Sequence, residues 1–120
     1  MKILEFQSLS DTDIQAILTA LPLVFDPVFD SSDEQTDINY LSCDSLKRKL
    51  LNRESSATYK ELSLLCCAVL AAKEYLSGRL PLSFDKAYQA ELSRYFFAYN
   101  KLAPACERTI SYLEETAFRP

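Results

Sequence analysis

The chain has 120 residues, of which 48% are hydrophobic and 25% are charged. These values are typical of a globular protein and exclude a disordered one, and the length suits one domain that folds without a metal ion or a disulfide. A single glycine is present, which argues against a sandwich or a barrel, because turn-rich β-proteins use glycine repeatedly at positive φ angles. We therefore expect one helical domain over residues 1–120.

The net charge of −4 is unevenly distributed along the chain. Residues 1–44 carry a net charge of −8, and residues 45–120 carry a net charge of +4. The two parts either attract each other within one fold or present separate surfaces to partners, and we favour the first interpretation.

The four cysteines follow neither the spacing of a secreted disulfide framework nor that of a zinc site. Cys66 and Cys67 are adjacent within an apolar run, which predicts that both are small core side chains. Since no N-terminal signal sequence is present, we expect reduced thiols and a cytoplasmic location. The longest apolar run, Leu64 to Ala72, has nine residues. A bilayer crossing takes about 20, so we expect no membrane association.

The first predicted helix begins after Ser10, which is a favourable N-cap, and Pro22 ends it. Residues 22–37 then lose all periodicity and carry five acidic residues, and they predict a long acidic surface loop. This loop lacks both the alternating acidic ligands and the glycine of a calcium-binding loop, so we expect no metal there. Phe25 and Phe29 interrupt the acidic segment. They either fold back onto the core, which we favour, or contact a partner.

Residues 38–52 have a weak helical pattern and contain most of the only basic cluster of the chain, which consists of Lys47, Arg48, Lys49 and Arg53. Proteins that bind nucleic acid usually present a wider basic surface. We therefore interpret the cluster as a solvated helix face, and we keep a nucleic-acid contact as the alternative.

Residues 58–77 give the clearest helical pattern. Thr58 and Glu61 form the T-x-x-E signature of a capping box, and Gly78 is placed to end the helix. The residues from Leu64 to Ala72 are apolar on every side of the helix. A helix of this kind has to be surrounded, so the sequence predicts an α-bundle of about five helices around residues 58–77.

The next predicted helix follows Ser83 and continues to about Tyr99, and the last one begins at Pro104. Tyr95 and Tyr99 lie in the apolar sector of the first of these helices. This sector is most simply core, but tyrosine is common at interfaces because its ring is apolar and its hydroxyl is polar, so both are also candidate partner contacts.

Phe97 projects away from that apolar sector, and Tyr112 projects away from the apolar stripe of the last helix. If the two helices pack as an antiparallel hairpin, these rings form one exposed apolar patch. A patch of this kind on a small protein is typical of a contact site, so both residues are candidate partner contacts.

The sequence contains no histidine and no glycine-rich phosphate loop, so we expect no catalytic activity and no cofactor. The favoured interpretation is a small cytosolic protein-interaction module, such as a regulator, an inhibitor, a chaperone or an immunity-type binder. Its partner is another protein or a second copy of the chain. The alternative is a nucleic-acid-associated helical protein that uses the basic cluster of residues 47–53.

Overall fold

Five α-helices and two short 3-10 helices make up the part of the chain that the computed structural model describes, which is residues 6–25, 33–54, 57–78 and 86–117. In chain order they are η1 (Phe6–Ser8), α1 (Asp11–Ala20), η2 (Leu21–Phe25), α2 (Asp33–Asn52), α3 (Tyr59–Leu76), α4 (Lys86–Arg94) and α5 (Phe96–Ala117). These residues contain no strand, so the prediction of an all-α bundle of about five helices is confirmed.

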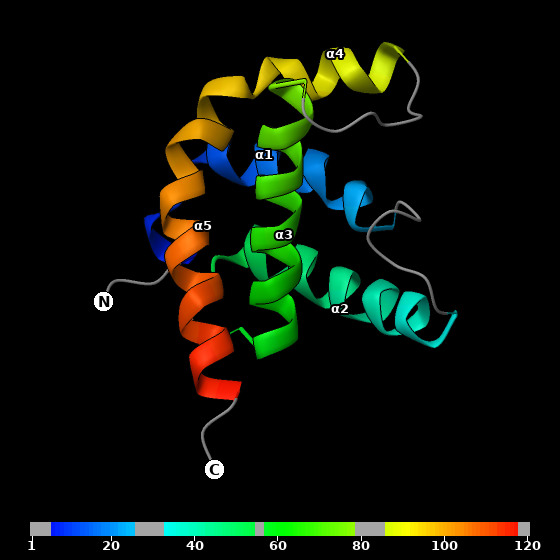
Figure 1. The fold of residues 1–120 in the computed structure, drawn as a ribbon, viewed down its shortest axis with the longest axis vertical. Helices are drawn as coiled ribbons and strands as arrows, with labels where there is room; N and C mark the ends of the chain where they lie inside the picture. The colour runs from blue at the N-terminus through cyan, green and yellow to red at the C-terminus, as the bar shows by residue number, and fades with distance from the viewer. Residues whose placement is uncertain (1–5, 26–32, 55–56, 79–85, 118–120) are drawn as a thin grey trace.

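α3 is the central helix, as the sequence predicts. Figure 1 shows α3 lying beside α5 and in front of α1, with α4 crossing its C-terminal end. The predicted caps are confirmed: Thr58 and Glu61 form the capping box, and Gly78 follows the helix with a φ of 77°. Only glycine adopts this left-handed conformation without strain, so the single glycine of the chain stands where the helix has to stop.

α3 and α5 run in opposite directions and form the largest contact between two elements (Figure 1). The thiols of Cys66 on α3 and Cys106 on α5 are buried next to each other, so these two positions lie at the same level of the helix pair. The largest fully buried apolar side chains come from every helix between α1 and α5 and meet around this pair: Ile17, Leu21, Leu23, Leu46, Leu50, Leu65, Val69, Leu92 and Tyr99.

α1 begins where the sequence predicts, because Ser10 is its N-cap. The Ser10 hydroxyl accepts a hydrogen bond from the Asp13 amide at 3.1 Å, and the Asp13 carboxylate accepts one from the Ser10 amide at 3.1 Å. Two of the four free amides at the helix start are thereby satisfied.

The predicted acidic loop over residues 22–37 is wrong at both ends. Leu21–Phe25 forms η2, and α2 begins at Asp33. Asp33 and Glu34 therefore belong to the first turn of a helix. Residues 26–32 lie outside the described part of the chain.

The predicted boundary between the last two helices is also wrong. The chain turns at Tyr95, and Pro104, the expected first residue of the last helix, lies inside α5. A proline within a helix leaves one carbonyl, here that of Asn100, without its usual donor. Pro104 and Asn100 are both exposed, so the interruption lies on the solvent side of α5, while Leu102, Ala103 and Cys106 continue the buried stripe of α5 across the proline.

α3 is not covered on every side, and the prediction that Cys67 is a core residue is wrong. Cys66 is fully buried, whereas Cys67 is exposed. Successive helix residues point about 100° apart, and the elements packed on α3 cover the side on which Cys66 lies. One stripe of α3 therefore lies outside the core, although the apolar run has no polar residue.

We expect a maleimide reagent to label one thiol in the native protein and four after unfolding. Desolvation raises the pKa of Cys67, so its labelling at mildly alkaline pH is slower than that of a free cysteine. It remains much faster than labelling of the buried Cys43, Cys66 and Cys106. Mass spectrometry of the intact protein counts the labels. Native labelling that persists in Cys67→Ala would contradict this placement.

Candidate interaction surfaces

An exposed pair of aromatic rings marks the corner at which α4 turns into α5. The side chain of Phe97 is 83% exposed, and that of Phe96 is 40% exposed. Their ring centroids lie 5.5 Å apart, and the ring planes meet at 77°. This edge-to-face arrangement is a favourable geometry for two aromatic rings, so each ring holds the other in place. We call Phe96 and Phe97 the aromatic corner.

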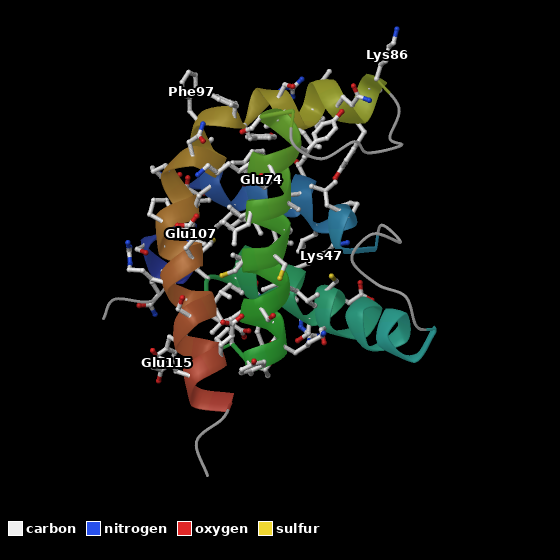
Figure 2. The ribbon with its side chains drawn as sticks, in the orientation of Figure 1. Lys47, Glu74, Lys86, Phe97, Glu107 and Glu115 are labelled. Atoms are coloured by element: carbon white, nitrogen blue, oxygen red, sulfur yellow. The ribbon has the colours of Figure 1, made fainter. Side chains whose placement is uncertain are left out.

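The aromatic corner stands on a well-anchored part of the fold. Figure 2 shows Phe97 projecting away from the bundle at the start of α5. Directly after it, Ala98 and Tyr99 are buried. The Tyr99 hydroxyl donates a hydrogen bond of 3.0 Å to the carbonyl of Ala16 on α1. Phe97 is therefore presented by a fixed backbone and not by a loop.

Tyr99 is not available as a partner contact, contrary to the sequence prediction. Its side chain is fully buried, and burial raises its pKa above the usual value for tyrosine. Tyr95 is partly buried and packs against the core. The helical wheel placed both on one sector, but the turn at Tyr95 separates them, because α4 and α5 follow different directions.

Phe97 and Tyr112 do not form one patch. Tyr112 is 42% exposed, but both residues belong to the continuous helix α5. Fifteen positions along one helix correspond to about 22 Å at 1.5 Å per residue. The expected hairpin between the two residues is therefore wrong, and they remain separate candidate contacts.

The structure gives no account of the two phenylalanines of the acidic segment. Phe25 is the last residue of η2, and its side chain lies outside the described part, as does the whole of Phe29. For both residues, the fold back onto the core and the contact with a partner therefore stay predictions.

The basic cluster is largely occupied by contacts within the fold. Lys49 donates a hydrogen bond of 2.8 Å to the buried carboxylate of Glu61, and Arg53 forms an ion pair with Asp11. Lys47 and Arg48 are exposed. Because carboxylates of the fold hold Lys49 and Arg53, Lys47 and Arg48 form a narrower basic surface than the one on which the nucleic-acid alternative was based.

Arg53 also has a structural role at the end of α2. Its φ of 50° is left-handed, and the amides of Arg53 and Glu54 bond back to the carbonyls of Leu50 and Lys49 at 3.2 and 3.0 Å. This pattern closes a helix C-terminus, a position that glycine usually fills.

The acidic and basic parts of the chain contact each other directly. Asp11 pairs with Arg53, and the buried carboxylate of Asp13 accepts a hydrogen bond of 2.9 Å from Lys101. Burial opposes the ionisation of Asp13, but the bonds from Lys101 and Ser10 outweigh it and hold the pKa of Asp13 below its usual value. These pairs support the interpretation that the uneven charge serves attraction within one fold.

Sequence reasoning missed three further exposed groups. Leu51 is 62% exposed near the end of α2, and Tyr59 is 50% exposed at the start of α3. Cys67 is exposed in the middle of α3. The sequence does indicate that Leu51 is exposed, because Leu51 shares a face of α2 with the charged residues Lys47 and Arg48. For Cys67 the sequence gives no such indication, because its neighbours in the run are all apolar.

The described residues hold no group of three or more side chains suited to a metal ion, and none of their helices is long and apolar enough to cross a membrane. An open hollow on the outer surface of α5 is lined by Pro104, Glu107, Arg108 and Ser111. It is shallow, and it lacks the enclosed apolar walls of a small-molecule site. No protein-family model, no curated protein and no solved structure matches the chain.

Proposed function

We propose that this chain is a protein-interaction module that binds another protein through the aromatic corner. The observation that supports the proposal is the 83% exposure of Phe97 on a rigid helix end. Burying a phenylalanine side chain is worth about 2 kcal/mol, a stabilisation that the isolated chain forgoes at this position. A partner that covers the ring recovers it.

The surroundings of the aromatic corner have the composition of an interface. Arg94, Asn100 and Lys101 are exposed close to the rings in the sequence. Interfaces typically place an aromatic centre inside a polar rim, and aromatic residues are the commonest positions at which truncation weakens binding. Because the backbone of α5 is already fixed, the entropic cost of ordering this surface on binding is lower.

We expect Phe97→Ala to leave the melting temperature within a few degrees and to weaken partner binding by at least about 1 kcal/mol, a factor of about five in Kd. The partner is first identified by affinity capture on the native chain, and its Kd is then measured by calorimetry. Leu51→Ala is the matched control, because it removes another strongly exposed apolar side chain, from α2.

Two results would contradict this proposal. Equal binding by Phe97→Ala and the native chain would remove the aromatic corner from the interface. A stability loss of about 3 kcal/mol would show that Phe97 is a core residue.

A further inference from the structure

The outer face of α5 carries a projecting ring near one end. Phe97, Pro104 and Ser111 are exposed and spaced seven residues apart, so their directions drift by only about 20° per interval. Figure 2 shows Phe97 near one end of α5 and Glu115 near the other, both on the side that faces away from α3. We call the face with Phe97, Pro104 and Ser111 the α5 outer face. It is a single surface that continues along the helix from the aromatic corner.

A hollow lies on the same face, further along the helix. It is lined by Pro104, Glu107, Arg108 and Ser111, and its volume is about 290 Å³. A cavity of about 150 Å³ accommodates a benzene molecule, so the hollow has room for a phenyl ring. Its mouth is open, which leaves a small molecule largely in water but admits a side chain that projects from another protein surface.

The side chains around the hollow suit an aromatic occupant. Pro104 supplies an apolar ring, and the planar guanidinium of Arg108 is a group that stacks on aromatic faces. Glu107 lies on the adjacent side of the helix, about 100° from Arg108. An aromatic ring is negative on its faces and positive at its edge, so a guanidinium over a face and a carboxylate at the edge both attract it. The hollow therefore favours a ring over an aliphatic side chain.

Phe97 is the most exposed large apolar side chain in the described part of the chain, and it does not reach the hollow of its own molecule. The hollow is centred near residue 107, ten positions along the same continuous helix, which is about 15 Å. A second copy whose α5 runs antiparallel brings ring and hollow together. A two-fold axis across the helices at the level of residue 102 places position 97 of each copy opposite position 107 of the other. One symmetric contact thereby seats both rings, as in an isologous dimer.

The charges near this axis do not oppose the contact. Lys101 is the charged residue nearest to the axis, so the two Lys101 side chains approach each other. Each ammonium group donates a hydrogen bond of 2.9 Å to the buried carboxylate of Asp13 in its own chain, so two neutral pairs meet and not two unpaired cations. Asn100 and Pro104, which are exposed on either side of this level, are uncharged. The seating of Phe97, and not a pairing of charges, selects the arrangement.

We propose that two copies of this chain associate through their α5 outer faces in antiparallel directions, with Phe97 of each copy seated in the hollow of the other, against Pro104 and Arg108. This inference rests on the proposed function, because it names a second copy as the partner of the aromatic corner. A contact along one helix face is small, so the dimer is weak and reversible.

We expect Phe97→Ala to weaken dimerisation at least about five-fold and Ser111→Tyr at least about ten-fold, because the first removes the ring and the second fills the hollow. Sedimentation equilibrium measures these constants, and circular dichroism shows whether the variants are folded. Ala87→Tyr is the control, because it adds the same side chain at an exposed position of α4. Its neighbour Lys86 lies at the end of α4 remote from α5 (Figure 2).

A mixture of the two variants tests the arrangement itself. Phe97→Ala keeps an open hollow, and Ser111→Tyr keeps its projecting ring, so a mixed pair restores one of the two contacts. We expect the mixture to associate more tightly than either variant alone, as measured by calorimetric titration of one into the other. A dimer that uses Phe97 in another way, such as ring against ring, gives no such recovery, and that result overturns the proposed arrangement.

The dimer and the proposed function fail in different ways. A native chain that stays monomeric at about 1 mM overturns the dimer, as does undiminished dimerisation of either folded variant. The proposed function is contradicted separately, when Phe97→Ala binds a captured protein as tightly as the native chain does. Weaker binding of that protein by Phe97→Ala, together with a monomeric native chain, overturns the dimer alone.

Discussion

Glu61→Ala is expected to destabilise the fold by about 3 kcal/mol at neutral pH, because it removes the acceptor of three hydrogen bonds at the start of α3. The Glu61 side chain is 2% exposed. Its carboxylate accepts bonds of 2.8 Å from each of Ser45, Lys49 and the Thr58 amide. The Thr58 hydroxyl in turn accepts one from the Glu61 amide at 3.2 Å. Lys49 is less buried than Glu61, so its ammonium group reaches water when Glu61 is removed. The loss of stability therefore does not include the cost of a buried, unpaired charge.

Part of this stabilisation depends on pH. Burial opposes the ionisation of Glu61, but the bonds from Lys49, Thr58 and Ser45 outweigh it and lower its pKa from 4.5 to about 2. The unfolded chain therefore takes up this proton at a higher pH than the folded chain. The contribution of Glu61 is complete above pH 4.5 and is lost as the pH falls towards 2. This difference in pKa corresponds to about 3 kcal/mol.

Urea unfolding of the native chain and of Glu61→Gln over this acidic range separates the charge of Glu61 from its capping role. Glutamine still accepts a capping bond, so the variant is expected to lose stability at neutral pH and to lose less on acidification than the native chain. Glu54→Gln, at an exposed position, is the control. Identical slopes against pH for the native chain and Glu61→Gln would show that Glu61 is not held ionised by these bonds.

Tyr99→Ala is expected to cost about 4 kcal/mol, because Tyr99 is the largest of the fully buried side chains and joins α5 to α1. Tyr99→Phe removes only the hydrogen bond to Ala16 and is expected to cost about 1 kcal/mol. The difference between the stability losses of the two variants is the part of the loss that comes from the packing of the Tyr99 ring.

Phe97→Ala, two positions earlier on the same helix, is the matched comparison, because it removes an exposed aromatic ring. Thermal and urea unfolding of the three variants test the assignment. A cost for Tyr99→Ala below about 1 kcal/mol would place Tyr99 at the surface.

The sequence alone located the elements that local chemistry defines. Thr58, Glu61 and Gly78 mark the two ends of α3 through interactions that span three or four residues, so the helix could be predicted without knowledge of its neighbours. Ser10 and its first-turn carboxylates marked the start of α1 in the same way. The single glycine of the chain indicated an all-helical fold.

The residues that were misassigned depend on contacts between segments distant in the sequence. The turn at Tyr95 and the continuation of α5 through Pro104 bury Leu102 and Ala103 against the core, and this gain outweighs the local preference of proline for a helix start. With the helix divided at Tyr95, Phe97 and Tyr112 belong to one helix and lie far apart, while Tyr99 lies in the core, as its place in the apolar sector indicates.

By itself, the sequence of this protein determined that the fold is helical, where α1 and α3 begin and which helix is central, because capping and hydrophobic pattern act within one turn of helix. Tertiary structure alone decided that Cys67 on α3 lies outside the core and that Phe97, which the helical pattern already turned outward, lies beside Phe96 at a corner of the fold. Burial depends on where the neighbouring helices lie, and their directions are set by the packing of the whole chain. The proposed contact surfaces are therefore properties of the folded molecule, and apolar residues of the same kind lie buried a position or two away, at Cys66 and Tyr99.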